Sequence, residues 1–155
     1  MVSSNLGPEL NLLMLCGPSR TIKEKKVAIE ALLFDGIDWT LFARQAIAHG
    51  LTSIAAHTLL ELASDFLPRD IADAFHTIVD ETSRTNRTLF DELGRLLDVL
   101  ATNGVEAIPL RGPVLAIQAY GQFGRRDSRK LELLIRRSDV LTEPSKLERG
   151  RLRAR

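Results

Sequence analysis

The chain has 155 residues, 45% of them hydrophobic and 26% charged, a balance typical of a soluble globular protein. Its single cysteine, Cys16, excludes an internal disulfide, and the sequence has no Cys/His spacing of the metal-binding type. No apolar run approaches the roughly 18 residues of a membrane span, and the N-terminus lacks the pattern of a signal peptide, so we expect no membrane partner and a cytoplasmic location.

Charge is distributed unevenly along the sequence. Residues 1–124 carry 10 Lys and Arg against 15 Asp and Glu, a net charge of −5, whereas residues 125–155 carry 11 against 5, a net charge of +6. A basic end of this kind suits a phosphate-bearing ligand or a nucleic acid. It is also typical of a solvated charged tail, and both interpretations stay open at this point.

The first two thirds of the chain are predicted to be helical. Asp38 is a good N-cap before an amphipathic stretch, and Pro68 stands where a helix tolerates proline, in its first turn. A stripe of leucines with helical spacing then follows, at positions 89, 93, 96, 97 and 100. We predict helices over residues 8–16, about 22–34, 38–49, about 52–63 and 68–103.

After Gly104 the periodicity changes from helical to extended. Residues 105–110 predict a strand, residues 113–120 a helix, and residues 130–135 a second strand. On that second strand Lys130 and Glu132 share one face, while Leu131, Leu133 and Ile135 share the other. Beyond Ser138 the apolar periodicity is lost.

These elements predict an α+β fold. We expect a helical domain over residues 1–103, a partial strand–helix–strand core over 104–140, and a basic, disordered tail over 141–155. Two strands alone form a weak sheet, so something is expected to be missing after residue 140.

The turn after the first strand is the first candidate binding site. Gly112 lets the backbone approach a ligand, the N-terminus of the next helix favours an anion, and Arg111 adds a charge suited to phosphate. A single glycine in such a turn is equally compatible with an ordinary strand–helix connection.

The second candidate site is the polar face of the strand at 130–135. Two carboxylates at i and i+2 can share a Mg²⁺ ion, but here Lys130 occupies the first position and only Glu132 is acidic. The pair is therefore expected to be closer to a salt bridge than to a metal cage. By spacing alone it could equally be an exposed strand face.

The combination of the two candidate sites resembles a known family. The stretch "NGVEAIPLRGPVLAIQAYGQFGRRDSRKLELLIRRSDV" is similar to the core of the uncharacterised bacterial nucleotidyltransferases of the polymerase-beta-like superfamily, with their pattern "G-I-x-x-x-x-L-K-G-x-x-L-A-x-x-x-Y" and then "L-R-x-x-x-D-h-D-L-L-V-x-x-x-D". The positions that match include Gly104, Leu110, Gly112, Leu115, Ala116, Tyr120, Arg126, Leu133, Leu134 and Asp139. The helical stretches, such as "DWTLFARQAIAHGL", also resemble the family.

The resemblance implies Mg²⁺-dependent transfer of a nucleotidyl group from an NTP to an acceptor. It assigns Arg111 and Gly112 to nucleotide binding and Glu132 to the metal. Three positions depart from the pattern: Arg111 replaces a lysine, Lys130 replaces the first metal-binding aspartate, and Glu132 replaces the second. The family's third carboxylate would lie beyond Arg155, so we expect a truncated member with a degenerate metal motif.

Three functional hypotheses follow from these departures. The first is a family member without catalysis of its own, because one metal ligand is lost. The second is a non-catalytic binding module for a nucleotide, RNA or a partner protein, with the basic end as a contact surface. The third is a subunit whose missing strands come from another chain, because exposed strand edges invite pairing.

Overall fold

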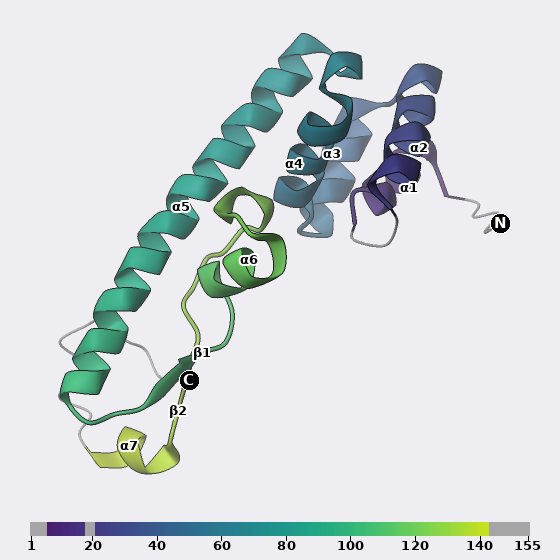
Figure 1. The fold of residues 1–155 in the computed structure, drawn as a ribbon. Helices are drawn as coiled ribbons and strands as arrows, with labels where there is room; N and C mark the ends of the chain where they lie inside the picture. The colour runs from purple at the N-terminus through teal and green to yellow at the C-terminus, as the bar shows by residue number, and fades with distance from the viewer. Residues whose placement is uncertain (1–5, 18–20, 143–155) are drawn as a thin grey trace.

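A single long helix, with shorter helices at one end and a small sheet near the other, dominates the molecule (Figure 1). The structure is a computed structural model that describes residues 6–17 and 21–142. The elements in chain order are α1 (Pro8–Leu15), α2 (Ile22–Asp35), α3 (Trp39–Ala48), α4 (Thr52–Ala63), η1 (Ser64–Phe66), α5 (Arg69–Thr102), β1 (Ala107–Pro109), α6 (Pro113–Tyr120), η2 (Phe123–Arg125), β2 (Leu133–Ile135) and α7 (Arg137–Thr142). The helices of the N-terminal part agree with the prediction, and within the described residues the predicted α+β fold is mostly helical with one small two-stranded antiparallel sheet. Of the disordered tail predicted over residues 141–155, residues 141 and 142 belong to helix α7 instead, and the rest lies outside the described residues.

Local capping explains where the first helices begin. The Thr21 hydroxyl accepts a hydrogen bond from the backbone N–H of Glu24 at the start of α2. The Asp38 carboxylate accepts from the N–H groups of Thr40 and Leu41, at 2.9 and 3.0 Å, at the start of α3. The N–H of Asp38 in turn donates to the buried Glu9 carboxylate at 3.1 Å, which ties α1 to the start of α3. The predicted N-cap at Asp38 is confirmed.

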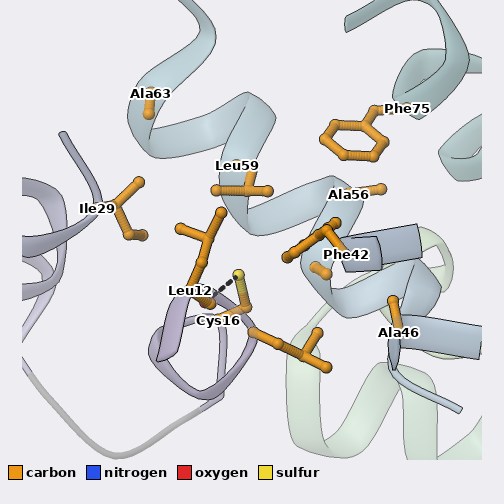
Figure 2. Close-up of a cluster of buried hydrophobic side chains, with 11 residues drawn as sticks. Leu12, Cys16, Ile29, Phe42, Ala46, Ala56, Leu59, Ala63 and Phe75 are labelled. Atoms are coloured by element: carbon orange, nitrogen blue, oxygen red, sulfur yellow. Dashed lines mark hydrogen bonds between the residues drawn. The ribbon is translucent and has the colours of Figure 1, made fainter. Parts of the chain in front are cut away.

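The main hydrophobic core lies where α1, α2, α3, α4 and the start of α5 converge (Figure 2). Leu12, Ile29 and Leu59 are fully buried, and Phe42 is 2% exposed. The ring of Phe42 also packs near that of Phe75, with a centroid separation of 6.4 Å. Fully burying a side chain of this size contributes about 1.5–3 kcal/mol, so this cluster anchors the helical end of the molecule.

Helix α5 carries contacts along its length with both halves of the chain. Its 34 residues extend for about 50 Å. Of its predicted leucine stripe, Leu93 and Leu100 are buried and the other three leucines are half-buried. Among the described residues, no helix is long and apolar enough to cross a membrane.

The loop after α6 is fastened to the middle of α5. The Asn86 side chain is fully buried, and its Nδ2 donates to the carbonyl oxygens of Phe123, at 2.6 Å, and Arg126. Gly124 lies so close to α5 that a Cβ there would stand 2.8 Å from the Ser83 Oγ and 2.9 Å from Val79. This loop is therefore the join between the two halves of the chain.

The sheet is smaller than predicted and antiparallel. Ile108 of β1 pairs with Leu134 of β2, and the N–H of Leu110 donates to the Glu132 carbonyl at 3.0 Å. The strands were predicted over 105–110 and 130–135, so Lys130 and Glu132 precede β2 instead of lying within it. The alternation of polar and apolar residues predicts which face of a strand each side chain occupies. It does not predict where hydrogen-bonded pairing with the other strand begins, and that is what limits β1 and β2. The last helix, α7, was not predicted.

The burial of Cys16 allows a prediction of how slowly its thiol reacts. Its thiol is 2% exposed and hydrogen-bonds to the Leu12 carbonyl at 3.3 Å, and burial raises its pKa from 9.0 to about 12. A shift of about three units lowers the thiolate fraction about a thousandfold at neutral to mildly alkaline pH. We expect the folded protein to react with an aromatic disulfide reagent at least that much more slowly than the urea-unfolded chain.

The raised pKa of Cys16 also determines the direction in which the stability of the fold changes with pH. A thiol whose pKa is raised by folding stabilises the protein fully below pH 9, and that contribution is lost as pH rises toward 12. Equal rates of thiol modification in the folded and unfolded states would contradict this account of Cys16.

Candidate functional site

The predicted phosphate turn has the backbone geometry of a glycine-dependent strand–helix junction. Gly112 adopts φ +71° and ψ −138°, and α6 begins immediately after it with Pro113 in its first turn. The first helical backbone bond runs from the Ala116 N–H to the Gly112 carbonyl at 3.3 Å. The N–H groups of Val114 and Leu115 therefore have no partner within the helix, and they are the groups that an anion at this turn would meet.

Gly112 also packs directly against the segment that carries the second candidate site. A Cβ on Gly112 would stand 3.0 Å from the carbonyl oxygen of Lys130. This contact joins two residues eighteen positions apart in the sequence. The two halves of the predicted site are therefore brought together, with Arg111 and Gly112 on one side and Lys130 and Glu132 on the other.

The Glu132 carboxylate forms ion pairs with cationic side chains from both parts of the candidate site. Lys130 Nζ lies 2.7 Å from Oε1, and Arg111 Nε lies 3.6 Å from Oε2. The hydrogen bond from Lys130 lowers the pKa of Glu132 below its usual value, the positive charges of Lys130, Arg111 and Arg126 add to that effect, and partial desolvation opposes it. The predicted salt bridge between Lys130 and Glu132 is confirmed. Because the pKa is lowered, the pairing is intact above pH 4.5 and is lost as pH falls through the lowered value.

The residues present do not fit a magnesium ion. Mg²⁺ takes oxygen ligands in octahedral geometry and repels nearby cations. Here an ammonium group holds one oxygen of Glu132, and a guanidinium group stands next to the other. Within residues 6–17 and 21–142, no three His, Cys, Asp or Glu side chains gather as a metal site would require. A role for Glu132 as a metal ligand stays a prediction that this geometry does not favour.

One site residue was not predicted from the sequence. Arg126 matches the family pattern, but it was not assigned a role; its charge acts on Glu132, and its Nε is buried with no hydrogen-bond partner among the described residues. Its backbone carbonyl accepts from Asn86, so the fastening of the loop to α5 also positions Arg126. The pattern "L-R-x-x-x-D" was the available signal, because the arginine stands four residues before the first acid position.

The neighbouring basic residues are mostly neutralised by carboxylates. Between residues 125 and 142, Arg125 pairs with Glu61, Arg129 with Asp127 at 3.0 Å, Lys130 with Glu132, and Arg136 with Glu106 at 2.6 Å. The described part of the basic end is therefore not a free positive surface. This observation weakens the interpretation of the segment as an extended nucleic-acid contact.

The Gly112 turn and the segment that carries Lys130 and Glu132, which the sequence resemblance assigns to one site, lie against each other in the structure. The chain belongs to a family described as uncharacterised nucleotidyltransferase, whose sequence profile matches residues 35–149, well over half of the chain. This confirms the resemblance seen in residues 103–140 and in the helix that begins at Asp38. No curated protein and no solved structure matches the chain.

The backbone geometry of Gly112 predicts that replacing this glycine lowers the stability of the fold more than an ordinary substitution does. Gly112→Ala forces an alanine into a backbone region used almost only by glycine, which costs about 1–3 kcal/mol, and presses a methyl group onto the Lys130 carbonyl. The matched control is Gly121→Ala, because Gly121 also has φ +71° but has open space around it, so its cost is about 1–2 kcal/mol. Urea unfolding curves compare the two; equal losses would show that the contact with Lys130 is not tight.

Proposed function

We propose that this chain binds a nucleoside triphosphate at the Gly112 turn without a bound magnesium ion and does not transfer its nucleotidyl group. The observation that supports this most directly is the ion pair of 2.7 Å between Lys130 and Glu132 at the position of the family's metal acids. The family reaction requires an ion that bridges protein carboxylates and phosphate oxygens. At this position the protein supplies an ammonium group in its place.

The phosphate contacts would come from four groups around the turn. The unpaired N–H groups of Val114 and Leu115 offer the positive end of α6, and Arg111 and Lys130 offer side-chain charge. The side chains of Arg111 and Lys130 are 68% and 74% exposed, so both can turn from Glu132 toward a ligand. A triphosphate presents more negative charge and more acceptor oxygens than one carboxylate does. It would therefore compete well with Glu132 for both cations.

The expected loss of catalysis follows from the same substitution. In nucleotidyl transfer the metal orients the phosphates and offsets the charge that develops in the transition state. A lysine can offset charge, but it cannot activate an acceptor hydroxyl as a bound metal does. We therefore favour binding over catalysis, and a nucleotide over RNA, because Arg111, Lys130 and the N-terminus of α6 converge on one turn and do not form an extended positive surface.

Nucleotide binding should not require magnesium. We expect ATP, titrated by calorimetry, to bind in EDTA at least as tightly as in excess Mg²⁺, because Mg²⁺ chelated by the triphosphate lowers the negative charge that Arg111 and Lys130 attract. Arg111→Gln and Lys130→Gln should each weaken binding about tenfold, because each removes a charge-assisted contact. The matched control is Arg95→Gln, since Arg95 is also an exposed arginine in an ion pair, with Glu92, but lies on α5.

The variant Glu132→Gln separates the two possible roles of Glu132. If Glu132 only holds Lys130 and Arg111, removing its charge frees both cations, and ATP should bind several-fold more tightly. If Glu132 is a metal ligand, the same variant should weaken binding and only in the presence of Mg²⁺. This second outcome, or any requirement of the wild-type protein for Mg²⁺, would overturn the proposal.

Absence of transfer is the second consequence. We expect no covalent incorporation of label from α-³²P-labelled NTPs, with Mg²⁺ or Mn²⁺, into the protein itself or into added RNA or protein acceptors. An active nucleotidyltransferase assayed in parallel serves as the control for substrate quality. Divalent-dependent incorporation that disappears in Arg111→Gln would show that the chain is a working enzyme.

A further inference from the structure

A second candidate site lies between the α3–α4 connection, the middle of α5 and the loop that precedes Lys130. It is a cavity of about 330 Å³, and none of Arg111, Gly112, Lys130 and Glu132 lines it. The volume falls at the small end of the roughly 300–1,000 Å³ that ligand sites occupy. The contributing residues of α5 include Ile78, Glu81, Thr82 and Thr85, whose spacing of i, i+3, i+4 and i+7 places them on one helix face.

A buried pair of hydroxyl groups forms part of the cavity wall. Ser53 and Thr82 are 6% and 8% exposed, and their side-chain oxygens are 3.0 Å apart. Two hydroxyls have two hydrogens, and the bond between them uses only one. Other threonines of α5, such as Thr77 and Thr88, donate to the carbonyl four residues earlier, whereas Thr82 makes no such bond among the described residues. One buried donor is therefore left over, and because a buried donor without an acceptor is unfavourable, an acceptor oxygen in the cavity is favoured.

The N-terminus of α4 adds further unused donors beside this pair. The helix begins at Thr52, and its N-cap, Leu51, has no side-chain oxygen to cap it. The first helical backbone bond runs from the Ala55 N–H to the Leu51 carbonyl at 2.9 Å, which leaves the N–H groups of Thr52, Ser53 and Ile54 without a helical partner. Thr52 and Ser53 both line the cavity, so this wall favours a carboxylate.

A negatively charged side chain lies on the α5 side of the same cavity. Glu81 lines it and is exposed, and within the described residues Glu81 has no ion-pair partner. The other lining carboxylate, Asp127, is already paired with Arg129 at 3.0 Å. Glu81 is thus the carboxylate available to an ammonium group, and it adjoins Thr82 in the sequence.

We propose that this cavity binds a free α-amino acid or a closely related zwitterion. The carboxylate of the ligand would accept from the uncapped N–H groups of α4 and from the Ser53–Thr82 pair, and its ammonium group would donate to Glu81. The two ends of the ligand meet the two kinds of wall that the cavity presents. This site is separate from the Gly112 turn and does not rest on nucleotide binding there.

The test is a titration of ¹⁵N-labelled protein followed by NMR. The probes are the individual L-amino acids at millimolar concentration, with acetate and ethylamine as ligands that carry only one of the two charges. We expect at least one amino acid to shift the amide signals of Thr52, Ser53 and Ile54, and the single-charge probes to bind about tenfold more weakly or worse.

Two variants locate the site. Glu81→Gln, at an exposed position that should not disturb folding, and Thr82→Val should each weaken amino-acid binding about tenfold or more. Thr88→Val is the matched control, because Thr88 is an exposed threonine of the same helix that does not line the cavity. The proposal is overturned if no amino acid shifts these amides, if Glu81→Gln binds as the wild type does, or if acetate binds as tightly as the amino acids. ATP binding by Glu81→Gln should be unchanged, which keeps the two sites distinguishable.

Discussion

The side-chain amide of Asn86 is the buried polar contact that fastens the C-terminal half of the chain to α5. Both of its N–H groups are used by backbone carbonyls of the loop between α6 and β2, and the residue is fully buried in the middle of α5. Phe123 adds to this attachment, because its ring packs 5.5 Å from that of Phe90 and beneath the guanidinium group of Arg87. Since this loop joins α6 to β2, fixing it to α5 fixes the Gly112 turn and Glu132 at the same time. A glycine at position 124 is what allows the loop to come that close.

The charges at the candidate site decide which kind of ion its backbone geometry can accept. The Gly112 turn, the N-terminus of α6 and the approach to β2 lie together, and Gly112 touches the Lys130 backbone. With Lys130 and Arg111 on either side of Glu132, the local field favours phosphate and disfavours a divalent cation.

Much of the helical part could be predicted from the sequence, because its signals are local. Asp38 and Pro68 mark helix starts, and the leucine spacing marks the buried face of α5. The strands were predicted too long, since alternation continues past the point where β1 and β2 stop pairing. Arg111, Gly112 and Glu132 were correctly expected to belong to one locality, through the family spacing. The roles of Arg126, Asn86 and the cavity beside Ser53 were not predicted, because each depends on contacts between residues 29 to 40 positions apart.

The contact between Gly112 and Lys130 involves the backbone of residue 130 and not its side chain. The fold therefore constrains position 112 tightly and leaves the chemistry at position 130 free, because the lysine side chain is largely exposed. A substitution of the Lys130 side chain is therefore expected to change the charge of the candidate site with little effect on the fold. Under the nucleotide-binding proposal, two parts of one residue serve separate purposes: the backbone carbonyl of residue 130 supports the fold, and its side chain meets the ligand.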